Sequence, residues 1–78
     1  MYDMPEGAFV IRVDKDSAAG EAGIQKGDII VSFDGQTVSG REDLENKLAY
    51  YEAGESVDVV VSRADNGEYV QKTISVTL

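Results

Sequence analysis

The sequence predicts an α+β fold: a small, partly open β-barrel or sandwich of about five strands, with one short and one longer helix. The chain has 78 residues, which is enough for one domain and too few for two. From Ala22 to Gly40, a helix stop, a turn, an apolar strand and a hairpin signal follow one another closely. Such spacing is typical of a compact barrel whose strands bend sharply between short connections. The hydrophobic content of 42% is enough for one aliphatic core.

The first third of the chain is expected to contain a strand and a short helix. The run Ala8–Val13 is short and rich in apolar residues, as strands are. Asp16 or Ser17 can cap one or two helical turns, and Gly23 suits the left-handed residue that ends such a helix. The residues before the strand show no clear periodicity, and their proline argues against a regular element there.

The middle of the chain is expected to form a buried strand and a hairpin. Gly27 and Asp28 make a turn before the apolar strand Ile29–Phe33. The dipeptide Asp34-Gly35 is a strong hairpin signal, and Gln36–Val38 provides a short return strand.

A longer helix is expected from Ser39 to about Tyr51. Ser39 and Glu42 have the spacing of a capping box, in which the serine accepts a helical amide hydrogen and the glutamate reaches back. Leu44, Leu48 and Tyr51 recur at i, i+4 and i+7, so they share one helix face. We expect Leu44 and Leu48 on this face to pack inward against the strand that follows.

Two further strands are expected to close the domain. They are Ser56–Arg63 and Tyr69–Leu78, joined by a turn. In the second of these, apolar and polar residues alternate, which indicates a half-buried antiparallel strand. The sequence shows no repeat, linker or low-complexity segment, so residues 1–78 are expected to form a single domain.

Composition excludes several classes of function. The chain has no histidine and no cysteine, which rules out a Ser-His-Asp triad and imidazole or thiolate metal sites within it. Asp28 has no histidine or second acidic residue at the spacing of metal ligands, so we interpret it as a residue that stabilises its turn. We therefore expect no catalytic residue, no metal site and no cofactor. Fifteen acidic and seven basic residues give a net charge of -8, which disfavours nucleic acid and anionic membranes as partners.

Four stretches carry a family resemblance, and together they span residues 7–78. They are GAFVIRV, DSAAGEAGIQKGDIIVSFDGQTV, DLENKLAYYEAGESVDVVVSR and KTISVTL. In this order they resemble a PDZ domain of the bacterial, circularly permuted type, most like those of HtrA/Deg-type trypsin-like serine proteases. The Ala-Gly-Ile-x-x-Gly-Asp-x-Ile run is the specific part. Ala18 stands where the family usually has a helix-opening proline.

The resemblance implies a non-catalytic peptide-binding module of a secreted or membrane-anchored serine protease, and so an extracytoplasmic parent protein. Its partner would be the extended, hydrophobic C-terminus of a protein, bound by strand addition in a groove beside the longer helix. Leu44, Leu48 and Tyr51 are assigned to this groove, although they can equally belong to the core. Lys47 lies beside them and can meet a carboxylate or an acidic side chain of the ligand.

One departure from the family pattern keeps other functions open. The family's carboxylate-binding loop and its strand come before the segment that matches Met1–Gly7, and we expect this chain to lack them. The edge of the strand GAFVIRV, which is expected to border the groove, would then be unpaired and could take up another chain. A self-association or intramolecular docking module, with a weak homodimer formed by strand addition, is therefore the alternative. A PDZ domain of a tail-specific or site-2 protease is the other alternative.

Overall fold

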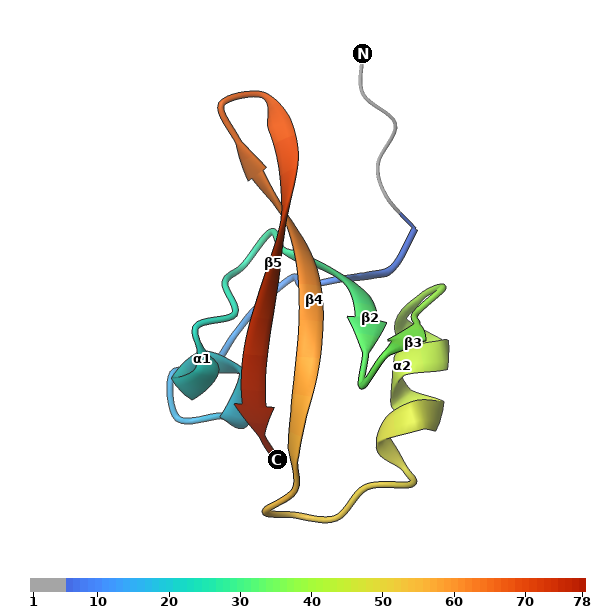
Figure 1. The fold of residues 1–78 in the computed structure, drawn as a ribbon. Helices are drawn as coiled ribbons and strands as arrows, with labels where there is room; N and C mark the ends of the chain where they lie inside the picture. Colours follow the sequence, from blue (N-terminus) through green and yellow to red (C-terminus); the bar gives the residue numbers. More distant parts are fainter. Residues whose placement is uncertain (1–5) are drawn as a thin grey trace.

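The computed structural model describes residues 6–78, which form one antiparallel sheet of five strands and two helices (Figure 1). The sheet has the order β1-β2-β4-β5, and β3 pairs with β2 beside this path. In chain order the elements are β1 (Ala8–Phe9), α1 (Ala18–Ala22), β2 (Ile29–Phe33), β3 (Gln36–Thr37), α2 (Arg41–Leu48), β4 (Ser56–Asp65) and β5 (Glu68–Thr77). This confirms the predicted α+β class and its elements; the sheet is open and does not close into a barrel.

The core lies on one face of the central strands. Alternate residues of β4 point into it, because successive side chains of a strand face opposite sides. Eight buried side chains form one cluster: Ala8, Ile24, Phe33, Val38, Val57, Val59, Val61 and Val76. Four of the five valines come from β4 and β5, which pair along their whole length from Ser56↔Thr77 to Asp65↔Glu68, and Val38 directly follows β3.

The short helix α1 begins and ends as the sequence predicts. Of the two predicted caps, Ser17 is the one used, and its Oγ accepts from the Gly20 N–H at 3.1 Å. Gly23 ends the helix in the left-handed conformation with φ 98°. Gly20 packs so close to the Asp14 carbonyl that a Cβ there would overlap it. The helix therefore lies tight against the segment that precedes it.

The first strand is much shorter than the predicted Ala8–Val13. Only Ala8 and Phe9 pair with β2, opposite Ile30 and Ile29. Beyond Phe9 the partner strand has already given way to a turn, because β2 begins at Ile29. Val10 keeps two bonds to that turn: its N–H donates to the Asp28 carbonyl, and its carbonyl accepts from the Gly27 N–H, both at 2.8 Å.

The predicted capping box of the longer helix is wrong. The helix α2 begins at Arg41, its N-cap is Gly40, and no side chain caps it. The carboxylate that reaches back belongs to Asp43, not to Glu42, and it accepts from the N–H of Ser39 at 3.0 Å. Gly40, one residue later than the predicted Ser39, is therefore the N-cap of the helix.

The end of α2 also differs from the prediction. The helix stops at Leu48, and the Tyr51 N–H then bonds to the Leu48 carbonyl three residues back. This tighter turn places Tyr51 over Phe33 and leaves Leu48 38% exposed, whereas Leu44 packs against the core. The prediction that Leu48 packs inward is therefore wrong. Neither helix described here is long and apolar enough to cross a membrane.

Candidate functional site

A groove of about 630 Å³ lies beside β1. Its walls come from β1 and the segment that follows it, from α1 and its exit, and from the first turns of α2. The lining residues are Ala8, Phe9, Val10, Ile11, Arg12, Val13, Asp14, Ser17, Ala19, Ile24, Ile30, Arg41 and Leu44. Most of these side chains are apolar, so the groove suits an apolar ligand with a few polar contacts.

The strand that borders the groove has an open edge. β1 is an edge strand of the sheet, and within residues 6–78 it pairs only with β2. The Val10 N–H faces the β2 side, since it bonds to Asp28, and alternation along the strand turns the Phe9 N–H to the open side. An extended chain laid along this edge can therefore receive main-chain hydrogen bonds.

Apolar side chains are exposed along the same edge. Phe9 is 51% exposed and Ile11 is 69% exposed. Exposed apolar groups gathered beside an open strand edge are a mark of an interaction surface. A ligand with apolar side chains can bury them while its backbone pairs with β1.

The predicted site residues fall into separate places. Leu44 lines the groove. Lys47 and Tyr51 line a different, more polar pocket of about 280 Å³, and its other lining residues are Gln36, Asp43, Asn46 and Tyr50. Leu48 lines neither of the two pockets. The structure thus brings one of the four predicted residues to the groove.

Lys47 is engaged within its own helix. Its Nζ donates to Asp43 Oδ1 at 2.9 Å, and the two side chains are 19% and 31% exposed. The hydrogen bond from Lys47, followed by the one from the Ser39 N–H, lowers the pKa of Asp43. The lysine charge is therefore balanced inside the domain, and the pair stabilises the first turns of α2.

Tyr51 ties the end of α2 to the β2–β3 hairpin. Its ring meets the Phe33 ring edge to face, with the centroids 5.1 Å apart. Its hydroxyl donates to Asp34 Oδ2 at 2.5 Å, and this bond raises the pKa of the tyrosine. These contacts give Tyr51 a place in the fold rather than in the groove.

Sequence reasoning missed the side chains that line the groove from β1. Phe9 and Ile11 share one parity of the run AFVIRV, while Ala8 and Val10 share the other. A strand whose odd- and even-numbered residues are both apolar can pack against apolar groups on both faces. That pattern was visible in the sequence and pointed to a second apolar surface here.

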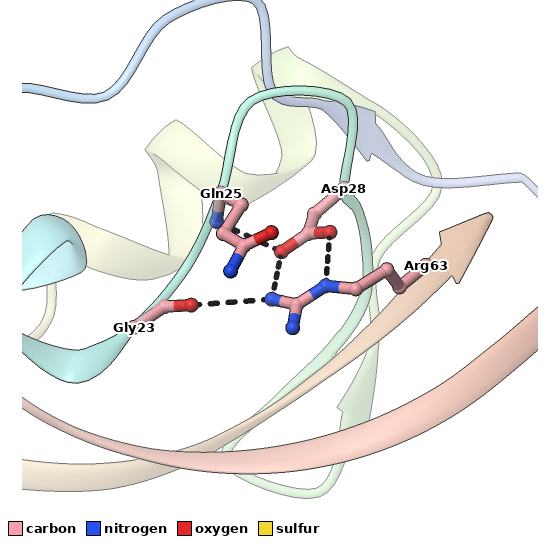
Figure 2. Close-up of polar contacts among 4 residues, drawn as sticks. All are labelled: Gly23, Gln25, Asp28 and Arg63. Carbon is pink, nitrogen blue, oxygen red and sulfur yellow. Dashed lines mark hydrogen bonds and ion pairs between the residues drawn. The ribbon is translucent and has the colours of Figure 1, made fainter. Parts of the chain in front are cut away.

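The wall of the groove near α1 is anchored by an ion pair between the partly buried Arg63 and the buried Asp28, shown in Figure 2. Arg63 of β4 donates from Nε and from one terminal nitrogen to the Asp28 carboxylate, at 2.8 and 2.7 Å. The same terminal nitrogen donates to the Gly23 carbonyl at 3.1 Å, and the Gln25 N–H donates to Asp28 at 2.9 Å. One guanidinium therefore fastens both ends of the loop 23–28 to the sheet (Figure 2).

This arrangement keeps Asp28 ionised. Burial by itself would raise its pKa, because the Asp28 side chain is only 2% exposed, but the hydrogen bonds from Arg63 and Gln25 outweigh burial and lower the pKa. The predicted turn role of Asp28 is present, since its carboxylate bonds to the Gln25 N–H. The partner from β4 could not be read from the sequence. Because Ile24 lies in the fastened loop and lines the groove, the ion pair fixes that wall.

Within residues 6–78, no three histidine, cysteine, aspartate or glutamate side chains gather where they could hold a metal ion. What the site offers chemically is recognition: an open strand edge, apolar side chains and two arginines at the rim, Arg12 and Arg41.

Comparison with known proteins identifies the relatives of this chain. A family model described as a PDZ domain matches residues 1–78. A probable periplasmic serine endoprotease DegP-like from Marinomonas sp. is 41% identical over 76 residues, and one from Halomonas elongata is 34% identical over 74 residues. These alignments cover 97% and 95% of this chain. They cover 15% of each relative, so the chain spans a small part of the curated relatives that it matches.

Solved structures give the same result. The solution structure of GtR34C from Geobacillus thermodenitrificans matches with a TM-score of 0.71 and 25% identity, over 94% of this chain and 78% of that one. An HtrA-type protease, AlgW with a decapeptide, matches with a TM-score of 0.68 and 32% identity, over 87% of this chain and 20% of that one. The predicted resemblance and fold class are confirmed.

Proposed function

Because this chain belongs to the PDZ domain family, we propose that it is the peptide-binding module of an HtrA/DegP-like serine protease and holds extended, hydrophobic C-terminal segments in the groove beside β1. The observation that carries this proposal is the open β1 edge, flanked by the exposed side chains of Phe9 and Ile11. The AlgW structure, which contains a decapeptide, supports a peptide as the class of ligand.

In this proposal the affinity and the specificity come from different groups. Main-chain hydrogen bonds along the β1 edge hold any extended chain, and side-chain contacts select among sequences. Phe9, Ile11 and Leu44 provide the apolar contacts. Leu48 follows Leu44 one helical turn later, and its exposed side chain can contact a longer peptide. We assign Lys47 to support of the fold, because its charge is paired with Asp43.

The names of the relatives guide the proposal for the whole protein. The curated relatives cited above are named probable periplasmic serine endoproteases DegP-like, which favours an HtrA/DegP-like parent over a tail-specific or a site-2 protease. We infer that the parent acts outside the cytoplasm. There, peptide binding by this module would hold substrates near the protease domain or shift that domain toward activity.

The test is a titration with a fluorescent decapeptide whose last four residues are hydrophobic. Phe9→Ser is expected to weaken binding by about tenfold, since about half of a phenylalanine's burial is at stake. Tyr50→Ser is the matched control, because Tyr50 is 89% exposed and does not line the groove. If both variants bind the peptide as tightly as the unmodified chain does, the groove is not the peptide-binding site.

The same open edge supports a second candidate function, self-association. A second copy could add its own strand to β1 and bury Phe9 and Ile11, as an unprotected edge strand allows. The net charge of -8 opposes this, so dimers should be weak and should strengthen as salt screens the repulsion. Sedimentation over a series of concentrations and salt levels distinguishes the two: a strict monomer at high salt excludes self-association.

A further inference from the structure

The basic residues of this acidic domain are unevenly distributed. Of the seven lysines and arginines, three are in ion pairs: Arg41 with Glu45, Lys47 with Asp43, and Arg63 with Asp28. Seven minus three leaves four without an ion-pair partner among residues 6–78. Three of these four line one shallow depression of about 390 Å³; they are Arg12, Lys15 and Lys26.

No carboxylate lines this depression. Its remaining lining residues are Val13, Gly20, Ile24 and Gln25. The floor is thus small or apolar, and the side chains that carry charge are all cationic. On a domain of net charge -8 this is a local concentration of positive charge with nothing in its lining to neutralise it. We call it the basic depression.

The basic depression is continuous with the groove. Arg12, Val13 and Ile24 line both. A chain that lies in the groove and leaves it past Arg12 therefore reaches Lys15 and Lys26 next. The ion pair of Asp28 with Arg63 fixes the loop that carries Lys26, because it bonds to both ends of that loop.

We propose that the basic depression is a specificity subsite for acidic residues of the bound polypeptide, next to the hydrophobic residues that occupy the groove. The proposal rests on the proposed peptide-binding function and names a feature of its ligand. Charge complementarity selects this occupant: three cations and no carboxylate face a segment with aspartate or glutamate side chains. A polyphosphate chain or an anionic bilayer would meet the repulsion of the whole domain, whereas a short acidic segment meets only the depression.

The contribution of each cation is expected to be modest. Arg12, Lys15 and Lys26 are exposed, and an exposed ion pair changes affinity by about two- to fivefold. The effect should fade as the salt concentration rises, because salt screens charges at the surface. Selection by this subsite is thus strongest at low ionic strength.

The experiment uses three synthetic peptides and the isotope-labelled chain, followed by NMR at low salt. The first peptide has six glutamates followed by four hydrophobic residues, the second has six glutamines followed by the same residues, and the third is hexaglutamate alone. The first should bind at least fivefold more tightly than the second. Hexaglutamate should bind weakly and shift the amide signals of Gly20, Gln25 and Lys26.

Matched variants locate the effect. Lys15→Gln and Lys26→Gln should each reduce the preference for the glutamate peptide by about two- to fivefold. Lys72→Gln is the control, because Lys72 is the fourth cation without an ion-pair partner within residues 6–78 and lies outside the depression. All three variants change the net charge by the same single unit, so a general charge effect would appear equally in each.

The outcomes separate this proposal from the proposed function. Equal binding of the glutamate and glutamine peptides in the groove would overturn the subsite and leave the groove in place. Shifts at the depression with hexaglutamate, but no groove binding by either hydrophobic peptide, would support the subsite as an acidic-peptide site and contradict the groove. Absence of these shifts, or larger ones with a single-stranded DNA decamer, would overturn the subsite.

Discussion

The sheet has β1 on one side of its strand order and the β4–β5 hairpin on the other. The two sides differ in whether their apolar residues are buried within the chain. On one side, β4 and β5 pair over ten residues each, and their valines Val57, Val59, Val61 and Val76 are at most 5% exposed. On the other side, β1 pairs over two residues, and Phe9 within it and Ile11 just after it remain exposed. The hairpin side supplies stability by burying its side chains within the chain. The β1 side keeps apolar surface available for another chain.

The two phenylalanines show the difference most clearly. Phe33 is 3% exposed and belongs to the core, whereas Phe9 is 51% exposed and belongs to the groove. The same residue type thus contributes to folding in one place and to recognition in the other. Matched substitutions on the two sides therefore test this difference.

The largest effect is expected from shortening these two phenylalanines. Phe33→Ala should lower the free energy of unfolding by about 3 to 5 kcal/mol, the usual cost for a buried phenylalanine. This is a large part of the total for a domain of this size, so the variant should be partly unfolded. Phe9→Ala should cost less than about 1 kcal/mol. Urea unfolding followed by circular dichroism measures both, and equal losses would contradict the division into two sides.

The next largest loss of stability is expected from breaking the Arg63–Asp28 ion pair, which is more buried than the Arg41–Glu45 pair. Arg63→Gln leaves the buried Asp28 carboxylate without its cation and should cost roughly 3 kcal/mol. Arg41→Gln is the matched control, because the Arg41–Glu45 pair is 81% and 60% exposed and should cost at most about 0.5 kcal/mol. Urea unfolding of both variants decides this. A loss as small for Arg63 as for Arg41 would show that the ion pair does not anchor the loop.

A smaller difference is expected between the two leucines of α2. Leu44 packs against the core and is half-buried, so Leu44→Ala should cost about 1 to 2 kcal/mol. Leu48 is 38% exposed and lies outside that cluster, so Leu48→Ala should cost less than about 0.5 kcal/mol. Thermal unfolding of the two variants provides the comparison. A larger loss for Leu48 would restore the inward packing that the sequence had predicted.

The smallest expected effect is a decrease in the free energy of unfolding at low pH. The folded-state pKa of Asp28 lies below its ordinary value of 3.8, so its contribution to stability is complete above that pH. The contribution is lost as the pH falls through the lower, folded-state pKa. The Asp28→Asn variant should lack this part of the acid sensitivity. Unfolding free energies between pH 7 and pH 2 test the sign, and identical slopes for both proteins would contradict it.

The sequence predicted most of the fold because its signals are local. The cap at Ser17, the left-handed Gly23 and the Asp34-Gly35 hairpin each depend on neighbours along the chain, and each lies where it was expected. The strand lengths could not be predicted as well, because the end of β1 is set by where its partner β2 begins.

The candidate site was less predictable than the fold. Helical spacing grouped Leu44 with Leu48 and Tyr51, but α2 ends at Leu48 and the tighter turn after it separates them. The pairing of Arg63 with Asp28 joins residues 35 positions apart, and no local pattern announces such a contact. The sequence predicts an unpaired edge for the strand GAFVIRV beside the groove, but Phe9 and Ile11 in this strand are not among the predicted site residues.

The central claim is that the β1 edge receives an extended chain while the hairpin side does not change. Amide hydrogen exchange with and without a saturating decapeptide that ends in four hydrophobic residues tests this most directly. Slower exchange is expected at the Phe9 amide, which faces the open edge, and unchanged exchange is expected at Val59 in β4. Unchanged exchange at Phe9 with the peptide bound, or new protection confined to the β4–β5 hairpin, would contradict it.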